Sequence, residues 1–122
     1  MPMRNKYRNK KSGGFASIKE HRRYNELAML QKVGIIYDLM TQVEYELIPA
    51  QYEFYERYGK NGKRLKDGAR LLERACVYVA DFVYKDGTGK TIVEDTKGVK
   101  TKDYIIKRKL MLYIHGIKIK EV

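Results

Sequence analysis

The stretch Val77–Lys97, VYVADFVYKDGTGKTIVEDTK, decides the fold because it predicts a β-hairpin. Val77–Tyr84 is rich in β-branched and aromatic residues, Lys85–Lys90 contains an Asp-Gly turn signal, and Thr91–Lys97 resumes the strand pattern. Two such runs joined by a short glycine-containing turn are typical of antiparallel strands. The sequence therefore predicts two adjacent strands in the second half of the chain.

Charged side chains occupy defined positions in this hairpin. Successive side chains of a strand point to opposite faces, so Asp81 is expected on the same face as the valines of its strand. On the second strand Asp95 and Lys97 share a face, whereas Glu94 points the other way unless a β-bulge intervenes. Charges on an apolar face are unfavourable unless they are paired or bind a metal. The pattern therefore predicts a functional site that comprises Asp81, Asp95 and Lys97.

Length and composition limit the classes of protein. A chain of 122 residues forms one domain, and 43% hydrophobic with 34% charged residues is typical of a soluble globular protein. No apolar run approaches the roughly 20 residues of a membrane span, and no signal peptide is recognisable, so we expect no membrane partner. The single cysteine, Cys76, cannot form an internal disulfide and is expected to be a buried thiol in a reducing cytoplasm.

The charge balance favours a polyanionic partner. The 26 lysine and arginine residues outnumber the 15 aspartate and glutamate residues, which gives a formal net charge of +11. Nucleic acid is the first candidate for such a partner and an anionic membrane surface a distant second, and a basic soluble protein without such a partner is the alternative. Eleven tyrosines are interleaved with the basic residues and favour nucleic acid, because aromatic rings stack on bases.

Two segments outside the hairpin are candidates for nucleic-acid contacts. Residues 1–14 form a flexible basic arm in which Arg4 and Lys6 can lie along phosphates, or they form a solvated tail without a role. Residues 50–70 predict a projecting hairpin or a long loop, because an aromatic run leads into a basic Asn-Gly turn. The candidate contacts of that turn are Lys60, Lys63 and Arg64. A mobile surface loop is the alternative interpretation.

The remaining elements complete an α/β order. Ser17 and Glu20 have the spacing of a capping box, which predicts a helix over residues 17–33. Glu20 is either a cap residue alone or an acid that reaches a metal. The other predicted elements are a strand at 41–48, a helix at 102–115 and an edge strand at 117–122. We therefore expect a single-domain α/β fold, in which helices flank a mixed sheet in the order helix, strand, strand, strand, helix, strand.

The acids and the lysine of the hairpin carry a resemblance to a known superfamily. Asp81, followed by Asp95-Thr96-Lys97 and placed between two helices, resembles the PD-(D/E)XK nucleases, whose core is αβββαβ. More narrowly, Tyr78–Tyr84 and Val93–Gly98 resemble a small family of phage and prophage proteins within that superfamily. The resemblance covers residues 15–122 as one nuclease domain, apart from the basic insertion.

The resemblance implies a role for each site residue. It implies that Asp81 and Asp95 bind Mg²⁺ or Mn²⁺ and that Lys97 is the catalytic lysine. It also implies that Glu20 is a metal-binding acid of the first helix, with Glu26 as its rival. In such a site the ion polarises the phosphoryl oxygen and activates water, while the lysine stabilises negative charge. No small-molecule cofactor is expected.

Three further positions bear on the resemblance. Members of the superfamily place a basic residue of the second helix near the site, and we expect Lys107 to be that residue. Ala80 replaces the proline that usually precedes the first aspartate, and Asp95 stands where glutamate is common. Both replacements make the short motif less distinctive.

The function implied by the resemblance is a metal-dependent endodeoxyribonuclease. A structure-selective role on Holliday junctions or branched DNA in phage DNA processing is the narrower expectation, with a homodimer as the expected assembly. The alternative is a non-catalytic DNA-binding protein on a nuclease scaffold. A basic structural or assembly protein is a third class, in which the acids form surface salt bridges.

Overall fold

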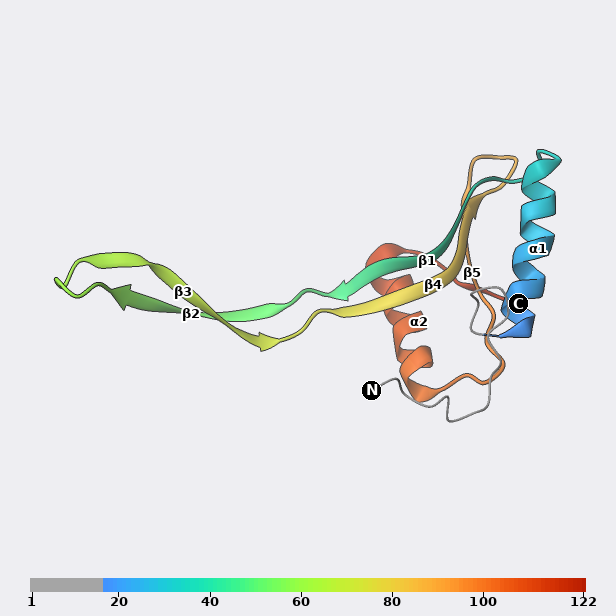
Figure 1. Ribbon diagram of the computed structural model, residues 1–122. Coiled ribbons are helices and arrows are strands. Elements are labelled where there is room, and N and C mark those ends of the chain that lie inside the picture. Colours follow the sequence, from blue (N-terminus) through green and yellow to red (C-terminus); the bar gives the residue numbers. More distant parts are fainter. Residues whose placement is uncertain (1–16) are drawn as a thin grey trace.

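The structure, a computed structural model, describes residues 17–122, and the arm predicted at residues 1–14, with Arg4 and Lys6, lies outside them. Two helices accompany a sheet from which a long two-stranded ribbon projects (Figure 1). The elements in chain order are α1 (Ile18–Lys32), β1 (Tyr37–Ile48), β2 (Gln51–Tyr58), β3 (Arg64–Glu73), β4 (Cys76–Lys85), β5 (Thr91–Asp95), α2 (Lys102–His115) and β6 (Lys120–Glu121).

The main sheet has the strand order β1-β4-β5-β6. Strand β4 pairs antiparallel with both β1 and β5, and β6 joins β5 in parallel. The hairpin predicted within Val77–Lys97 is β4 and β5. Its turn is closed by the Asp86 carboxylate, which accepts hydrogen bonds from the backbone N–H groups of Thr88 and Lys90 at 2.9 and 3.0 Å. The predicted α/β fold with a mixed sheet is therefore confirmed.

Strands β2 and β3 form a separate two-stranded sheet, so the hairpin alternative for residues 50–70 is the correct one. At its base, Ile48 of β1 still pairs with Cys76 of β4. The hairpin is therefore an insertion between two strands that are already partners. Figure 1 shows it extending away from both helices. We call β2, β3 and the turn between them the ribbon.

Both helices begin at the predicted caps. The Ser17 hydroxyl accepts a hydrogen bond from the Glu20 N–H at 3.1 Å, and the Thr101 hydroxyl accepts one from the Tyr104 N–H at 3.2 Å. These bonds satisfy N–H groups that have no partner within the helix. Helix α2 ends at Gly116, whose φ of 67° is accessible to glycine without the strain that a side chain would add.

Each helix packs with its own cluster of buried side chains. The cluster at α2 consists of Leu47, Tyr78, Ala80, Val83, Val93, Tyr104, Met111 and Ile119. The cluster at α1 consists of Leu27, Ile36, Phe82 and Tyr84. Strand β4 contributes to both clusters, as is typical of a central strand whose two faces are covered.

The valines of β4 do not form the apolar face that strict alternation predicted. Val83 is buried, but Val77 is half-buried and Val79 is 38% exposed. Strict alternation is interrupted near Asp81, because both Ala80 and Val83 pack in the α2 cluster, whereas Phe82 packs in the α1 cluster. Val83 therefore lies on the opposite face of β4 from Val77 and Val79, which belong to neither cluster. Asp81 is half-buried and lies at this interruption.

Candidate functional site

Asp81 and Asp95 come together where β4 and β5 separate. The pairing of the two strands places Phe82 opposite Glu94, and β5 ends one residue later at Asp95. Immediately beyond, the backbone N–H and the hydroxyl of Thr96 each donate a hydrogen bond to Asp81 Oδ2 at 2.8 Å. These two bonds hold the Asp81 carboxylate beside Asp95, close enough to influence its ionisation.

The Asp95 carboxylate is fully buried and only partly satisfied. The Tyr78 hydroxyl donates a hydrogen bond to Oδ2. Oδ1 has no hydrogen-bond partner among residues 17–122, although Lys97 Nζ lies 3.5 Å from it. Burial, and to a smaller extent the neighbouring Asp81, raises the pKa of Asp95 to about 6. A buried acceptor without a hydrogen bond is unfavourable by about 1–3 kcal/mol, so this oxygen is unusual in a folded core.

Lys97 adds a cation at the margin of the acid pair. Its side chain is 36% exposed, and Nζ lies 5.2 Å from the centroid of the Tyr104 ring on α2. The guanidinium carbon of Arg108 lies 5.9 Å from the same centroid. Tyr104 therefore has two cations within cation–π distance. The α2 cation beside Lys97 is Arg108, whereas Lys107 makes no hydrogen bond or ion pair with the described residues.

Glu20 is buried against β1. Its exposed fraction is 2%, and its Oε1 accepts a hydrogen bond from Gln42 Nε2 at 2.8 Å. Gln42 lies between the β1 residues that pair with Ala80 and Phe82. It therefore lies opposite Asp81 on the neighbouring strand. Its φ of 53° is uncommon for a residue with a side chain, and such strain is concentrated at functional sites. The Gln42 amide therefore connects the acid of α1 to the strand that faces Asp81.

Glu26 and Glu94, the alternatives to Glu20 and Asp95, have different surroundings. Glu26 is 56% exposed and pairs with Arg23 Nη1 at 2.9 Å. Glu94 is fully buried on the α1 side of β5, where Arg23 Nε and Nη2 donate to its two oxygens at 2.8 Å and the Tyr84 hydroxyl donates as well. Burial opposes the ionisation of Glu94, but the hydrogen bonds from Arg23 and Tyr84 outweigh it and hold its pKa below the usual value. Glu94 is thus ionised, and Arg23 compensates its charge within the fold.

The acid pair suits a hard divalent cation that keeps several waters. Mg²⁺ is commonly bound by one or two carboxylates, and the unsatisfied Asp95 Oδ1 is an oxygen ligand that lacks another partner. Among residues 17–122, no three His, Cys, Asp or Glu side chains are placed to hold one ion together. The residues present therefore fit a site in which Asp81 and Asp95 are the ligands, while Glu20 is engaged by Gln42.

The predicted nucleic-acid contacts of the insertion lie near the end of the ribbon. Lys60 and Lys63 are exposed in the turn between β2 and β3. Arg64 is also exposed, but Nη2 is 2.8 Å from Asp67 Oδ1 and 4.0 Å from Glu56 Oε1. The two lysines are therefore the cations of this turn that have no ion pair among the described residues.

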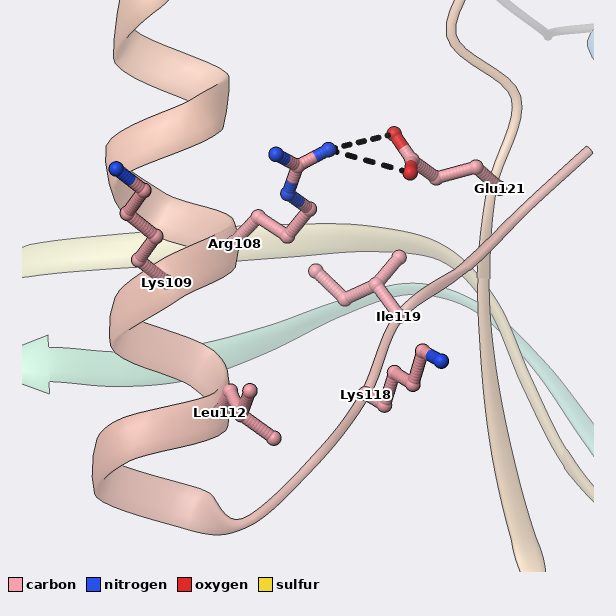
Figure 2. Close-up of a pocket in the computed structure, with 6 residues that line it drawn as sticks. All are labelled: Arg108, Lys109, Leu112, Lys118, Ile119 and Glu121. Carbon is pink, nitrogen blue, oxygen red and sulfur yellow. Dashed lines mark hydrogen bonds and ion pairs between the residues drawn. The ribbon is translucent and has the colours of Figure 1, made fainter.

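A pocket of about 290 Å³ lies between α2 and the C-terminal segment. It is lined by Arg108, Lys109, Leu112, Lys118, Ile119 and Glu121. Figure 2 shows Arg108 directed toward Glu121, and its Nη1 is 3.3 and 3.4 Å from the two carboxylate oxygens. Arg108 is thus shared between this pocket and the Tyr104 ring beside Lys97.

Sequence patterns missed four of the side chains that organise this site. They are Gln42, Tyr78, Thr96 and Arg108. Tyr78 looks like any aromatic residue of a buried strand, and Gln42 looks like a polar residue of an amphipathic one. Only Thr96 had a signal, because it stands between Asp95 and Lys97 in the motif.

These observations define a single-domain α/β protein in which a half-buried and a fully buried carboxylate lie with a lysine where β5 ends beside β4. The chain belongs to the family described as protein of unknown function (DUF1064), whose model matches residues 4–120. Comparisons with curated proteins and with solved structures give no match. Neither helix in the described part of the chain has the length and apolar character needed to cross a membrane.

Proposed function

We propose that this chain is a metal-dependent endodeoxyribonuclease that hydrolyses DNA phosphodiesters. The observation that carries the proposal is the Asp81–Asp95 pair with Lys97 Nζ 3.5 Å from Asp95 Oδ1, a buried oxygen without a hydrogen bond. A structural core gains nothing from such an oxygen, whereas a site that binds Mg²⁺ or Mn²⁺ requires one.

Each residue of the site has a distinct task in this proposal. Asp81 and Asp95 bind the cation, which supplies Lewis-acid chemistry at the scissile phosphate when it is bound. Lys97 stabilises negative charge on the phosphate. Tyr78 and Thr96 are positioning residues, because their hydrogen bonds orient the two carboxylates. Glu20 is also a positioning residue, because it accepts a hydrogen bond from Gln42, which lies opposite Asp81 on β1.

DNA is the proposed substrate because of charge. The net charge of +11 and the exposed lysines near the tip of the ribbon, Lys60, Lys63 and Lys66, favour contacts with phosphates. A projecting ribbon suits a branched substrate such as a four-way junction, which presents more than one duplex. A homodimer would supply two sites, one for each cut strand.

One observation favours the alternative of a DNA-binding protein that does not cut. Glu20 is held by Gln42, and no third acid among residues 17–122 is placed with Asp81 and Asp95 to hold one ion. A two-carboxylate set that binds the ion weakly would leave a nuclease scaffold without activity. Metal binding and cleavage therefore have to be measured separately.

The test is cleavage of supercoiled plasmid and of a synthetic four-way junction with Mg²⁺ or Mn²⁺. The wild-type chain should cut at least one substrate, and Asp81→Ala, Asp95→Asn and Lys97→Ala should each lower the rate by about 100-fold or more. The matched controls are Asp103→Asn and Lys118→Ala, which change exposed residues that make no hydrogen bond or ion pair with the described acids and lysine of the site and should retain activity.

A parallel measurement follows the melting temperature as either cation is added. Stabilisation of the wild type that is lost in Asp95→Asn would support metal binding at this pair whatever the outcome of the cleavage assay. Wild-type protein that binds DNA, is not stabilised by either metal and cuts neither substrate would favour the DNA-binding alternative and overturn the nuclease proposal.

A further inference from the structure

One face of the ribbon is apolar and uncovered. Tyr52 pairs with Leu71 and Phe54 pairs with Ala69, and directly opposite residues of antiparallel strands point to the same side. The rings of Tyr52 and Phe54 are 6.5 Å apart, and these side chains are 51% and 69% exposed. Leu71 is 47% exposed. We call these four residues the apolar face of the ribbon.

The opposite face is satisfied within the ribbon. Glu53 and Arg70 pair across the strands, with 3.6 Å between Arg70 Nη1 and Glu53 Oε2. The Arg70 guanidinium lies 5.2 Å from the centroid of the Tyr55 ring. That ring lies on Gly68, where a Cβ atom would be 2.3 Å from Tyr55 Cζ. An ion pair, a cation–π contact and a ring packed on a glycine thus occupy this face, whereas the apolar face carries only exposed aromatic and aliphatic side chains.

The ribbon has no support from the rest of the described chain. β2 and β3 pair only with each other, and Figure 1 shows them projecting from the sheet and the helices. A two-stranded sheet alone is marginally stable in water, and a contiguous apolar surface marks a site of interaction. We infer that this face packs against the same face of a second copy of the chain, with the two ribbons antiparallel about a two-fold axis.

Symmetry favours an identical partner. In a two-fold contact the same patch meets itself, so a charged patch would bring like charges together. None of the four residues of the apolar face is charged. The eight residues of β2 span about 27 Å at 3.4 Å per residue, which gives the contact a length comparable with that of a small domain.

The charges at the two ends of the ribbon favour the antiparallel arrangement. Residues 56–67, at the tip, include five basic and two acidic residues. Residues 44–53 and 70–77, on the two sides of the base, together include four acidic and two basic residues. Antiparallel packing places each basic tip near the acidic base of the partner, whereas parallel packing would bring the two basic tips together.

Nucleic acid fits the apolar face less well. Affinity for nucleic acid comes mainly from cations that contact phosphates, and this face has none. The ribbon lysines that have no ion pair among the described residues, Lys60, Lys63 and Lys66, lie in or next to its turn. The inferred contact therefore leaves a different part of the ribbon for DNA, and it does not depend on nuclease activity.

The test is the mass of the full chain in solution, measured by light scattering across a concentration series. The wild type should have twice the 14.4 kDa mass of one chain. Phe54→Glu places two like charges at the contact and should raise the dissociation constant by about 100-fold or more. Tyr113→Glu is the matched control, because Tyr113 is an aromatic residue of α2 that is 88% exposed. It should remain dimeric.

Two further variants keep the test decisive. Phe54→Ala adds no charge and should weaken association by about tenfold, so a folding defect of Phe54→Glu would not hide the effect. The double variant Lys60→Glu/Lys63→Glu should weaken association if the ribbons are antiparallel. Association that this double variant strengthens would instead indicate parallel ribbons and overturn the arrangement.

Two outcomes would overturn the inference as a whole. The first is a wild-type chain that stays monomeric at every concentration. The second is Phe54→Glu that dimerises as tightly as the wild type. If the wild type is monomeric, an affinity for single-stranded or junction DNA that falls in Phe54→Glu but not in Tyr113→Glu would assign the apolar face to nucleic acid.

Discussion

Two neighbouring acids on opposite sides of β5 differ in how completely their carboxylates are hydrogen-bonded. Glu94 and Asp95 are adjacent and both have no exposed surface. On the α1 side, Glu94 receives two hydrogen bonds from Arg23 and one from Tyr84. On the α2 side, Asp95 receives one from Tyr78 and retains an oxygen without any. Their pKa values move in opposite directions, lowered for Glu94 and raised for Asp95.

This difference separates a carboxylate that stabilises the fold from one that is available for chemistry. A buried ion pair with complete hydrogen bonding fixes the position of α1 on the sheet. An incompletely satisfied acid beside a second carboxylate lowers stability and is typical of a functional site. Exposure alone does not distinguish the two residues, because both are fully buried. Their hydrogen-bond partners distinguish them.

The largest effect on stability is expected from Arg23→Ala. The substitution leaves Glu94 buried without its cation, so the free energy of unfolding should fall by about 3–5 kcal/mol. Urea denaturation measures this change. The control is Arg22→Ala, an exposed neighbour on α1 that should shift the free energy by about 0.5 kcal/mol or less. Equal losses in the two variants would show that the ion pair does not anchor α1.

Asp95→Asn should change the free energy of unfolding in the opposite direction and stabilise the protein. In the absence of divalent cations it should raise the free energy of unfolding by about 1–3 kcal/mol at neutral pH, because it removes a buried charge that lacks full hydrogen bonding. The folded-state pKa of about 6 lies above the unfolded value, so ionised Asp95 destabilises the wild type above that pH. The gain should therefore shrink as the pH falls through about 6 toward 4.

Glu94→Gln is the comparison for that experiment. Its pKa is lowered in the folded state, so its ionised form contributes stability at neutral pH, and that contribution is lost as the pH falls below the usual range of glutamate. Glu94→Gln should accordingly be less stable than the wild type at neutral pH. A loss of stability in Asp95→Asn under the same conditions would contradict the distinction between the two acids.

The two tyrosines provide a smaller test of the same distinction. Tyr84→Phe and Tyr78→Phe each remove one hydrogen bond to a buried carboxylate, and each should lower the free energy of unfolding by about 1–2 kcal/mol. Only Tyr78→Phe should also change the stabilisation by Mn²⁺, because only its partner lies in the proposed metal site. Melting curves with and without Mn²⁺ measure both effects. An equal response of the two variants to the metal would count against Asp95 as a ligand.

The smallest effect is expected from Glu26→Gln. Glu26 is 56% exposed and pairs with Arg23 one turn of α1 away. Exposed pairs of this kind contribute about 0.5 kcal/mol or less, so stability and cleavage should both stay close to those of the wild type. A large loss of cleavage would instead make Glu26 the helix-borne acid. The buried alternative, Glu20→Gln, should have the greater effect on cleavage.

The hairpin and its acids were predictable because a strand has a period of two and the turn has a strong local signal. Register therefore placed Asp95 with Lys97 and turned Glu94 away. Alternation failed for the valines around Asp81, because it is interrupted there: Ala80 and Val83 pack on the same side of β4, and Phe82 packs on the other. The interruption depends on contacts between residues far apart in the chain.

The partners of the acids were beyond the reach of local patterns. To predict that Arg108, and not Lys107, lies over the Tyr104 ring, the rotation of α2 about its axis must be known to within one residue. One residue corresponds to about 100° around the helix axis. The bond between Glu20 and Gln42 joins a helix to a strand 22 residues later. Sequence reasoning could therefore identify the acids and the lysine, whereas the hydrogen bonds that distinguish their roles required the three-dimensional arrangement.

The pairing of Ile48 with Cys76 has an evolutionary consequence. Because the two strands already meet at the base of the ribbon, everything between them occupies the place of a simple hairpin turn. The ribbon can lengthen, shorten or change its chemistry while the register of β1 and β4, and with it the acid pair, stays the same. A lineage could thus acquire a new recognition module at this position without redesigning the core.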